Sequence, residues 1–135
     1  MRLPCWLLLA VLACVACDGD HAPDQRGATQ LTSANGSFTA TFRPDPDPPV
    51  TGTNALDIEL GDDHGEPVAG AALSVEPWMP AHGHGSSHAP VVEELGGGKY
   101  RASQIELSMP GAWELRIGVS AGESADSFLL EVEVR

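Results

Sequence analysis

From Ser37 onward, apolar side chains alternate with polar ones in short runs that are separated by Gly, Pro or Asp. A two-residue period is typical of strands with one buried face, and no window shows a helical period. The alternation predicts seven strands, over residues 38–42, 56–60, 71–75, 91–95, 99–107, 113–119 and 128–134. We therefore expect an all-β fold over residues 37–135, an immunoglobulin-like antiparallel β-sandwich of about seven strands.

Three departures from simple alternation add detail to this fold. The apolar phase shifts within residues 99–107, which predicts a β-bulge near Ser103 and Gln104. The segment 43–52, RPDPDPPVTG, holds four prolines and is expected to form a loop, since proline gives a sheet no N–H donor. For Tyr100 the simpler interpretation is a half-buried strand residue, and a tyrosine corner is the alternative.

The first 17 residues have the pattern of an export signal. A basic residue precedes an apolar run over residues 6–16, which is too short to span a bilayer permanently. All three cysteines lie in this segment, so the exported part has none for a disulfide or a thiolate metal site. Small residues before a terminal Cys resemble a bacterial lipoprotein signal, which implies lipidation of Cys17. Cys14 is a competing position, and an ordinary cleaved signal is the other alternative.

Length and charge narrow the class of protein further. The chain has 135 residues, enough for one domain, and a net charge of −12, the wrong sign for a nucleic-acid-binding protein. Residues 18–36 are polar and show no period, so we expect a flexible tether between a membrane anchor and the sandwich. The predicted location is extracytoplasmic, on the membrane as a lipoprotein facing the periplasm or the cell surface.

The candidate chemistry lies in residues 78–90, WMPAHGHGSSHAP, which contain three of the five histidines. In an extended chain His82 and His84 project to the same side, and the following Gly-Ser-Ser would let His88 approach them. Imidazole suits copper, zinc and nickel, and thioether sulfur favours copper. We therefore expect a copper site, with zinc as the alternative, formed by His82, His84 and His88 and assisted by Met79 and Met109.

Strand parity supports this grouping. If successive strands alternate in direction, the connections that contain Met79 and Met109 open at one end of the sandwich, and His64 lies at the other end. Other interpretations of the same residues stay open. The histidine segment is then a solvated connection without an ion, the methionines plug the mouth of the core, and Trp78 covers the core as a lid.

Catalysis is not expected. Ser86 and Ser87 lie beside histidines, but they stand in no nucleophile-elbow motif, and a Gly-Ser loop would not hold an attacking group in place. A catalytic zinc on the three histidines would need a carboxylate base such as Glu93 and a substrate cavity, which one short loop does not form. The sequence thus favours a non-enzymatic protein.

Several motifs together resemble the YtkA-like domain family, which is related to FixH-like proteins of bacterial envelopes. They are Met79-Pro80 before His82-Gly83 and His84-Gly85, then Gly98-Lys99-Tyr100, then Met109-Pro110-Gly111-Ala112-Trp113. The resemblance covers roughly residues 50–134 and implies an exported β-sandwich linked to copper handling or to the assembly of copper-containing oxidases. Family members often carry a further Met where this chain has Ala81. The implied function is binding and delivery of a metal to an envelope complex; the alternative is a module that binds an envelope protein and no metal.

Overall fold

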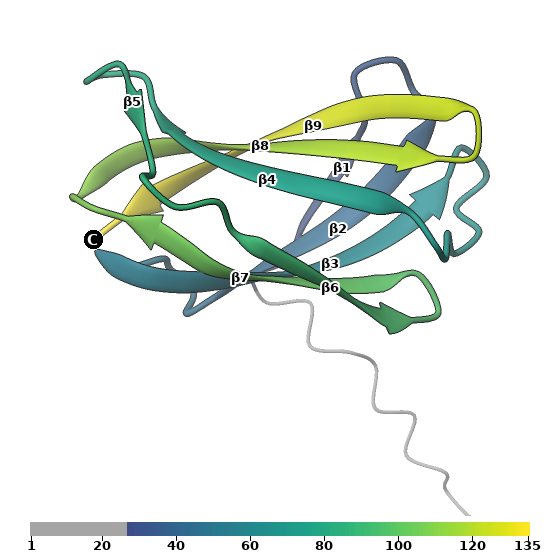
Figure 1. Ribbon diagram of the computed structural model, residues 1–135, viewed down its shortest axis with the longest axis horizontal. Coiled ribbons are helices and arrows are strands. Elements are labelled where there is room, and N and C mark those ends of the chain that lie inside the picture. The colour runs from purple at the N-terminus through teal and green to yellow at the C-terminus, as the bar shows by residue number, and fades with distance from the viewer. Residues whose placement is uncertain (1–26) are drawn as a thin grey trace, which may run out of the picture.

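The structure, a computed structural model, describes residues 27–135. It contains nine strands, namely β1 (Thr29–Thr32), β2 (Phe38–Asp45), β3 (Gly52–Asp62), β4 (Ala72–Met79), β5 (His84–Gly85), β6 (Val91–Gly96), β7 (Lys99–Leu107), β8 (Gly111–Ala121) and β9 (Ser124–Val134). They form two antiparallel sheets in the orders β1-β2-β3-β7-β6 and β5-β4-β8-β9. The two layers face each other in Figure 1, so the predicted all-β sandwich is confirmed. No helix long and apolar enough to cross a bilayer occurs in this part of the chain.

The core lies between the inner faces of the two sheets. Alternate residues of the long strands are buried there, as the two-residue period predicts. The largest fully buried side chains are those of Trp113, Tyr100, Phe42, Leu56, Ile58, Ile105, Leu107 and Ile117. With no cysteine in the body, this apolar interior is what stabilises the sandwich.

The sandwich begins earlier in the chain than expected. Strand β1 lies inside the predicted tether 18–36 and pairs with β2, and Leu31 packs against the core. The carboxylate of Asp126 accepts hydrogen bonds from the Ser33 hydroxyl at 2.7 Å and from backbone N–H groups of Asn35 and Ser37. The polar residues that resemble a tether are therefore partners of a distant carboxylate. The predicted signal, Cys17 and residues 18–26 lie outside the described residues.

These hydrogen bonds also set the acidity of Asp126. Partial burial acts to raise its pKa, but the Ser33 hydroxyl and the backbone N–H groups stabilise the charged form more strongly, and the pKa falls to about 2. The carboxylate is thus ionised at all ordinary pH values. It holds the turn after β1 against the hairpin between β8 and β9.

The bulge predicted in residues 99–107 is confirmed. Two residues of β7, Ser103 and Gln104, oppose one residue of β3, and Gln104 has a φ of 59°. The loop prediction for 43–52 is wrong at its start, since β2 continues to Asp45. Pro44 has no N–H to donate, but this costs no hydrogen bond to β1. Strand β1 begins at Thr29, which pairs with Phe42, so no residue of β1 lies opposite Pro44.

Tyr100 is more than a half-buried strand residue. Its ring is fully buried, its hydroxyl donates to the Val68 carbonyl at 2.7 Å, and it accepts from the Ala71 N–H at 3.1 Å. The residue thereby fixes the connection between β3 and β4. As in a tyrosine corner, the hydroxyl bonds to backbone groups. In a tyrosine corner, however, those groups lie a few residues upstream, whereas here they lie in the β3–β4 connection.

Candidate functional site

The histidine segment starts as a tight hairpin rather than a loose loop. After β4 ends at Met79, the N–H groups of His82 and Gly83 both donate to the Met79 carbonyl, at 3.2 and 2.9 Å. Gly83 has a φ of 64°, a value that favours glycine. The chain then returns as β5 alongside β4. His84 is therefore held by strand pairing.

Gly85 is what allows β5 to lie so close to β4. A Cβ atom at this position would lie 2.7 Å from the Pro77 carbonyl oxygen, which is shorter than real Cβ contacts. Because the obstacle is backbone, a larger residue would push the two strands apart. The glycines of this segment, which resemble a flexible hinge in the sequence, thus have different roles.

The hairpin brings His84 to the mouth of the core. His84 is the direct cross-strand partner of Met79, and such partners carry their side chains on the same face of a sheet. Met79 is only 3% exposed, so this is the inner face. On the next strand, the Trp113 ring meets the His84 ring edge to face, with ring centroids 5.9 Å apart and an angle of 73° between the planes. An imidazole and a thioether side chain are therefore neighbours beside a buried indole.

His82 completes the cluster that we call the hairpin site, defined as Met79, His82 and His84. The rings of His82 and His84 have centroids 5.9 Å apart. Two imidazoles that bind one ion through bonds of about 2.0 Å have centroids roughly 5 to 6 Å apart, so the pair is close to the required spacing. His84 Nδ1 lies 3.3 Å from the Gly85 carbonyl oxygen. The tautomer that donates there leaves the lone pair of Nε2 for a ligand.

Met109 lies at the same end, as strand parity predicts. The Trp113 Nε1–H donates to the Met109 carbonyl at 3.0 Å, and the Met109 side chain is partly buried against the core. The Met79 methyl lies 3.0 Å from the place a Cβ on Gly111 would occupy, two residues further on. Both Met-Pro dipeptides thus border the mouth where His84 lies.

His88 does not join the other two histidines. It hydrogen-bonds to the Ser87 hydroxyl at 3.0 Å and lines a polar groove of about 650 Å³ with Thr53, Gln104 and Glu106. Within residues 27–135 no group of three or more His, Cys, Asp or Glu side chains could hold a metal ion. The structure does not bring the three imidazoles together as expected. The reason is that β5 fixes His84, while the following segment runs from β5 to β6 and carries His88 away.

Trp78 also differs from its prediction. The alternation of β4 continues to its last residue, so Met79 takes the inner face and Trp78 the outer face. There its ring lies under the Arg116 guanidinium, 4.9 Å from the ring centroid. Trp78 is thus no lid on the core, and Met79 is the buried plug at its mouth. His64 lies in the turn after β3, at the opposite end, beside Asp63 at 3.6 Å.

The arrangement contains residues that sequence reasoning did not connect to the site. Trp113 was expected only as a core residue, and its contact with His84 depends on β5, which is too short to show a period. Glu106 and Gln104 reach the groove of His88 through the bulge in β7. The phase shift in residues 99–107 signals that bulge, but it does not tell which loop faces it.

An immunoglobulin-like sandwich with histidine and methionine side chains at one mouth is the class that these features define. A family model described as YtkA-like matches residues 21–118, and the chain belongs to this family. Among solved structures, a DUF4426 family protein from Pseudomonas aeruginosa PAO1 is similar, with a TM-score of 0.54 and 17% identity over 79% of this chain and 94% of that chain. At this identity the likeness shows the fold alone. A search of curated protein sequences gave no match.

Proposed function

We propose that this protein binds a transition metal ion, copper in the first place, at the hairpin site. His82 and His84 supply imidazole nitrogen, and Met79 supplies thioether sulfur. Met109, in the connection between β7 and β8, is a further sulfur ligand. The observation that carries the proposal is the pairing of Met79 with His84, because it brings a soft sulfur and an imidazole together without any loop movement. That donor set favours copper over zinc.

The environment of the site supports a transfer role more than a tight storage role. The donors lie at the mouth of the core, His82 is exposed, and two sides of the site are formed by Trp113 and the Met109 connection. An ion held there would be open to a partner on one side only. His88 lies in a neighbouring groove and is a second donor that such a partner, or a change in residues 86–90, would bring into play. We propose delivery of the ion to a protein complex of the cell envelope.

Export and anchoring are part of the proposal. The apolar run that ends at Cys17 would carry the domain out of the cytoplasm, and lipidation of Cys17 would keep it at the membrane. Mass spectrometry of the mature protein tests this directly. A mature chain that begins at a diacylated Cys17 agrees with the proposal, and a chain that begins at another residue contradicts it.

Metal binding is tested by titrating residues 18–135 with Cu(I), Cu(II) and Zn(II). We expect one equivalent of copper to bind, more tightly than zinc, and the binding to weaken in acid because protons compete with the ion for imidazole nitrogen. M79L, which keeps the volume of the plug, is expected to weaken Cu(I) far more than Zn(II). No binding of any of the three ions above buffer background would overturn the proposal and leave the interaction module as the function.

A further inference from the structure

The outer faces of the two sheets differ in how their charges are satisfied. On the larger sheet, Arg43 pairs with Glu59 at 2.8 Å, and Arg101 bridges Asp45 and Asp57 at 2.6 Å each. The hydrogen bonds to Asp45 and Asp57 raise the pKa of Arg101, so both arginines of this face are engaged by carboxylates of neighbouring strands.

The smaller sheet leaves carboxylates open on its outer face. Its arginine, Arg116, donates twice to Glu114, at 2.9 and 3.1 Å. Glu76, Glu131 and Glu133 form no ion pair with any other residue of 27–135. Glu131 stands directly opposite Glu114 in the register, and like charges in that position repel. This face therefore has an excess of negative charge at the β9 edge.

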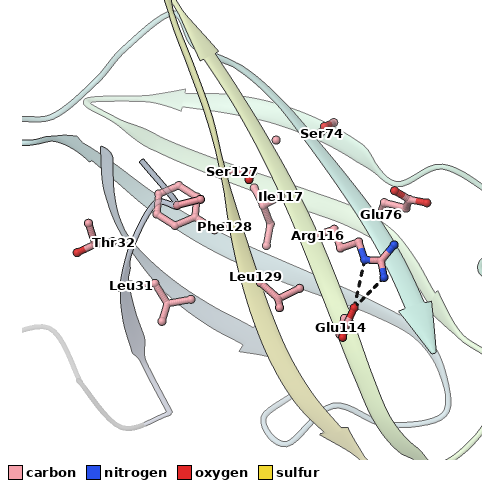
Figure 2. A pocket seen from close by; sticks show the side chains of 12 residues that line it. Leu31, Thr32, Ser74, Glu76, Glu114, Arg116, Ile117, Ser127, Phe128 and Leu129 are labelled. Carbon is pink, nitrogen blue, oxygen red and sulfur yellow. Dashed lines mark hydrogen bonds and ion pairs between the residues drawn. The ribbon is translucent and has the colours of Figure 1, made fainter. Parts of the chain in front are cut away.

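The same edge is hollowed beside an exposed leucine. A groove of about 710 Å³ starts at β1 and the edge of β9 and extends over the outer face of β8 and β4, where Arg116 and Glu76 also line it (Figure 2). Leu31 and Thr32 form its β1 side, and Leu129, which is 51% exposed, lies on its β9 side. Gly118 contributes no side chain to the floor, where a Cβ would lie 2.7 Å from the Ser74 hydroxyl oxygen. A smaller hollow next to it is lined by Glu114, Glu131 and Glu133.

Backbone groups point into this space as well. At one end of the β9 edge the Ser127 carbonyl accepts from the Ala34 N–H, and at the other end Arg135 exchanges hydrogen bonds with Pro49 and Thr51. Since every second residue of an antiparallel strand faces the same side, the N–H and C=O groups of residues 129, 131 and 133 face this edge too. Within residues 27–135 they have no backbone partner there. The edge is open over five residues and closed at both ends.

We propose that β9 receives an extended, basic segment of a partner protein as an additional strand. The free backbone groups would pair with it, and cross-strand neighbours would match side chain to side chain. Running antiparallel to β9, the segment would place two basic residues opposite Glu133 and Glu131 and an apolar residue opposite Leu129. Its pattern is Lys or Arg, any residue, Lys or Arg, any residue, apolar.

Charge decides among the occupants. A second copy of this chain would bring Glu131 and Glu133 against acidic neighbours, and edge charges of this kind prevent self-pairing. The chain's own residues 18–26 carry three Asp and one Arg, so they do not supply a basic strand. A basic partner is complementary both to the edge and to the net charge of −12.

The test uses the mature protein, without metal, and the peptide Ac-Thr-Lys-Thr-Lys-Thr-Val-Thr-amide as the probe. We expect saturable binding at low ionic strength, weaker binding in salt, and slower hydrogen exchange at the amides of Leu129, Glu131 and Glu133. The double variant E131K/E133K should weaken binding about tenfold. The control E66K/E93K changes the net charge equally at exposed positions outside β9 and its hairpin and should bind as the wild type does.

Each other outcome overturns the proposal. Equal losses in the two double variants would mean diffuse attraction to an acidic protein. Protection of amides on another edge, such as β6, would place the strand elsewhere. Absence of saturable binding, or equal binding of a peptide with Glu in place of Lys, would show that the edge does not select a basic segment. None of these results bears on metal binding at the hairpin site, so the two proposals fail separately.

Discussion

The hairpin of residues 79–85 and the segment 86–90 are neighbours in the chain and both contain histidine, but different forces hold them. The hairpin has two turn hydrogen bonds to Met79, strand pairing with β4 and the contact of His84 with Trp113. The segment has mainly short-range contacts, such as Ser87 with His88. The density of histidine in a sequence therefore does not tell where the rings go. Pairing with a neighbouring strand fixes His84, and its absence leaves His88 elsewhere.

The largest effect is expected from removing the residue against which the hairpin rests. W113A would delete a buried indole and leave a cavity, at a cost of about 3 to 5 kcal/mol in the free energy of unfolding. W78A is the matched control, because that ring lies on the outer face and its loss forfeits about 0.5 to 1 kcal/mol of contact with Arg116. Urea unfolding measures both. Equal losses would mean that Trp113 is not the support of this end.

Replacing the histidines one at a time tests whether the two regions differ in function. We expect H84A to weaken copper binding about 100-fold, the scale at which even a supporting residue of a metal site is felt. H88A should leave the affinity within about a factor of two, since His88 lies in the groove of Glu106. Competition titration with a chromophoric chelator measures these affinities. A larger loss in H88A than in H84A would reverse the assignment.

Disturbing the backbone of the hairpin should also weaken copper binding, but less than the loss of His84 does. In G85A the new methyl group meets the Pro77 carbonyl, β5 moves away from β4, and copper affinity falls about tenfold although every proposed ligand is retained. S87A is the control in the unpaired segment and should bind normally. Normal affinity in G85A would mean that strand pairing does not position His84.

The smallest effect concerns the opposite end of the sandwich and depends on pH. The folded-state pKa of Asp126 is lowered to about 2 from 3.8, so its contribution to stability is complete above about pH 4 and is lost as the pH falls through about 2. D126N should lower the thermal midpoint at neutral pH and approach the wild type near pH 2, with copper affinity unchanged. The same difference in midpoint at both pH values would contradict the role of the ionised carboxylate.

The sequence predicted the elements that have a long enough period. Strands β7, β8 and β9 alternate over many residues, and the phase shift in β7 located the bulge at Ser103 and Gln104. Strands β1 and β5 were missed, because four and two residues carry no period. Each of these strands is stabilised by contacts with another part of the chain. Strand β1 pairs with β2 and is followed by a turn that bonds to the Asp126 carboxylate, and β5 pairs with β4. These are long-range or backbone contacts that local patterns do not encode.

For the candidate site, the sequence predicted at which end of the sandwich the site lies, but not which histidines lie together there. Parity placed Met79 and Met109 at one mouth, and the contacts of Trp113 and Gly111 agree. The separation of His88 could not be predicted, because it depends on where β5 stops and on which groove the following residues cross. Trp78 was assigned to the wrong face because the end of β4 was placed too early in the chain.

Metal binding at the hairpin site is tested most directly by following the imidazole signals of all histidines by ¹⁵N NMR while Cu(I) or Zn(II) is added to the mature protein. We expect His82 and His84 to change together and to saturate at one equivalent, while the signals of His88 and His64 stay unchanged. If His88 responded first, or if all histidines shifted in proportion to added metal without saturation, the hairpin site would not be the metal site.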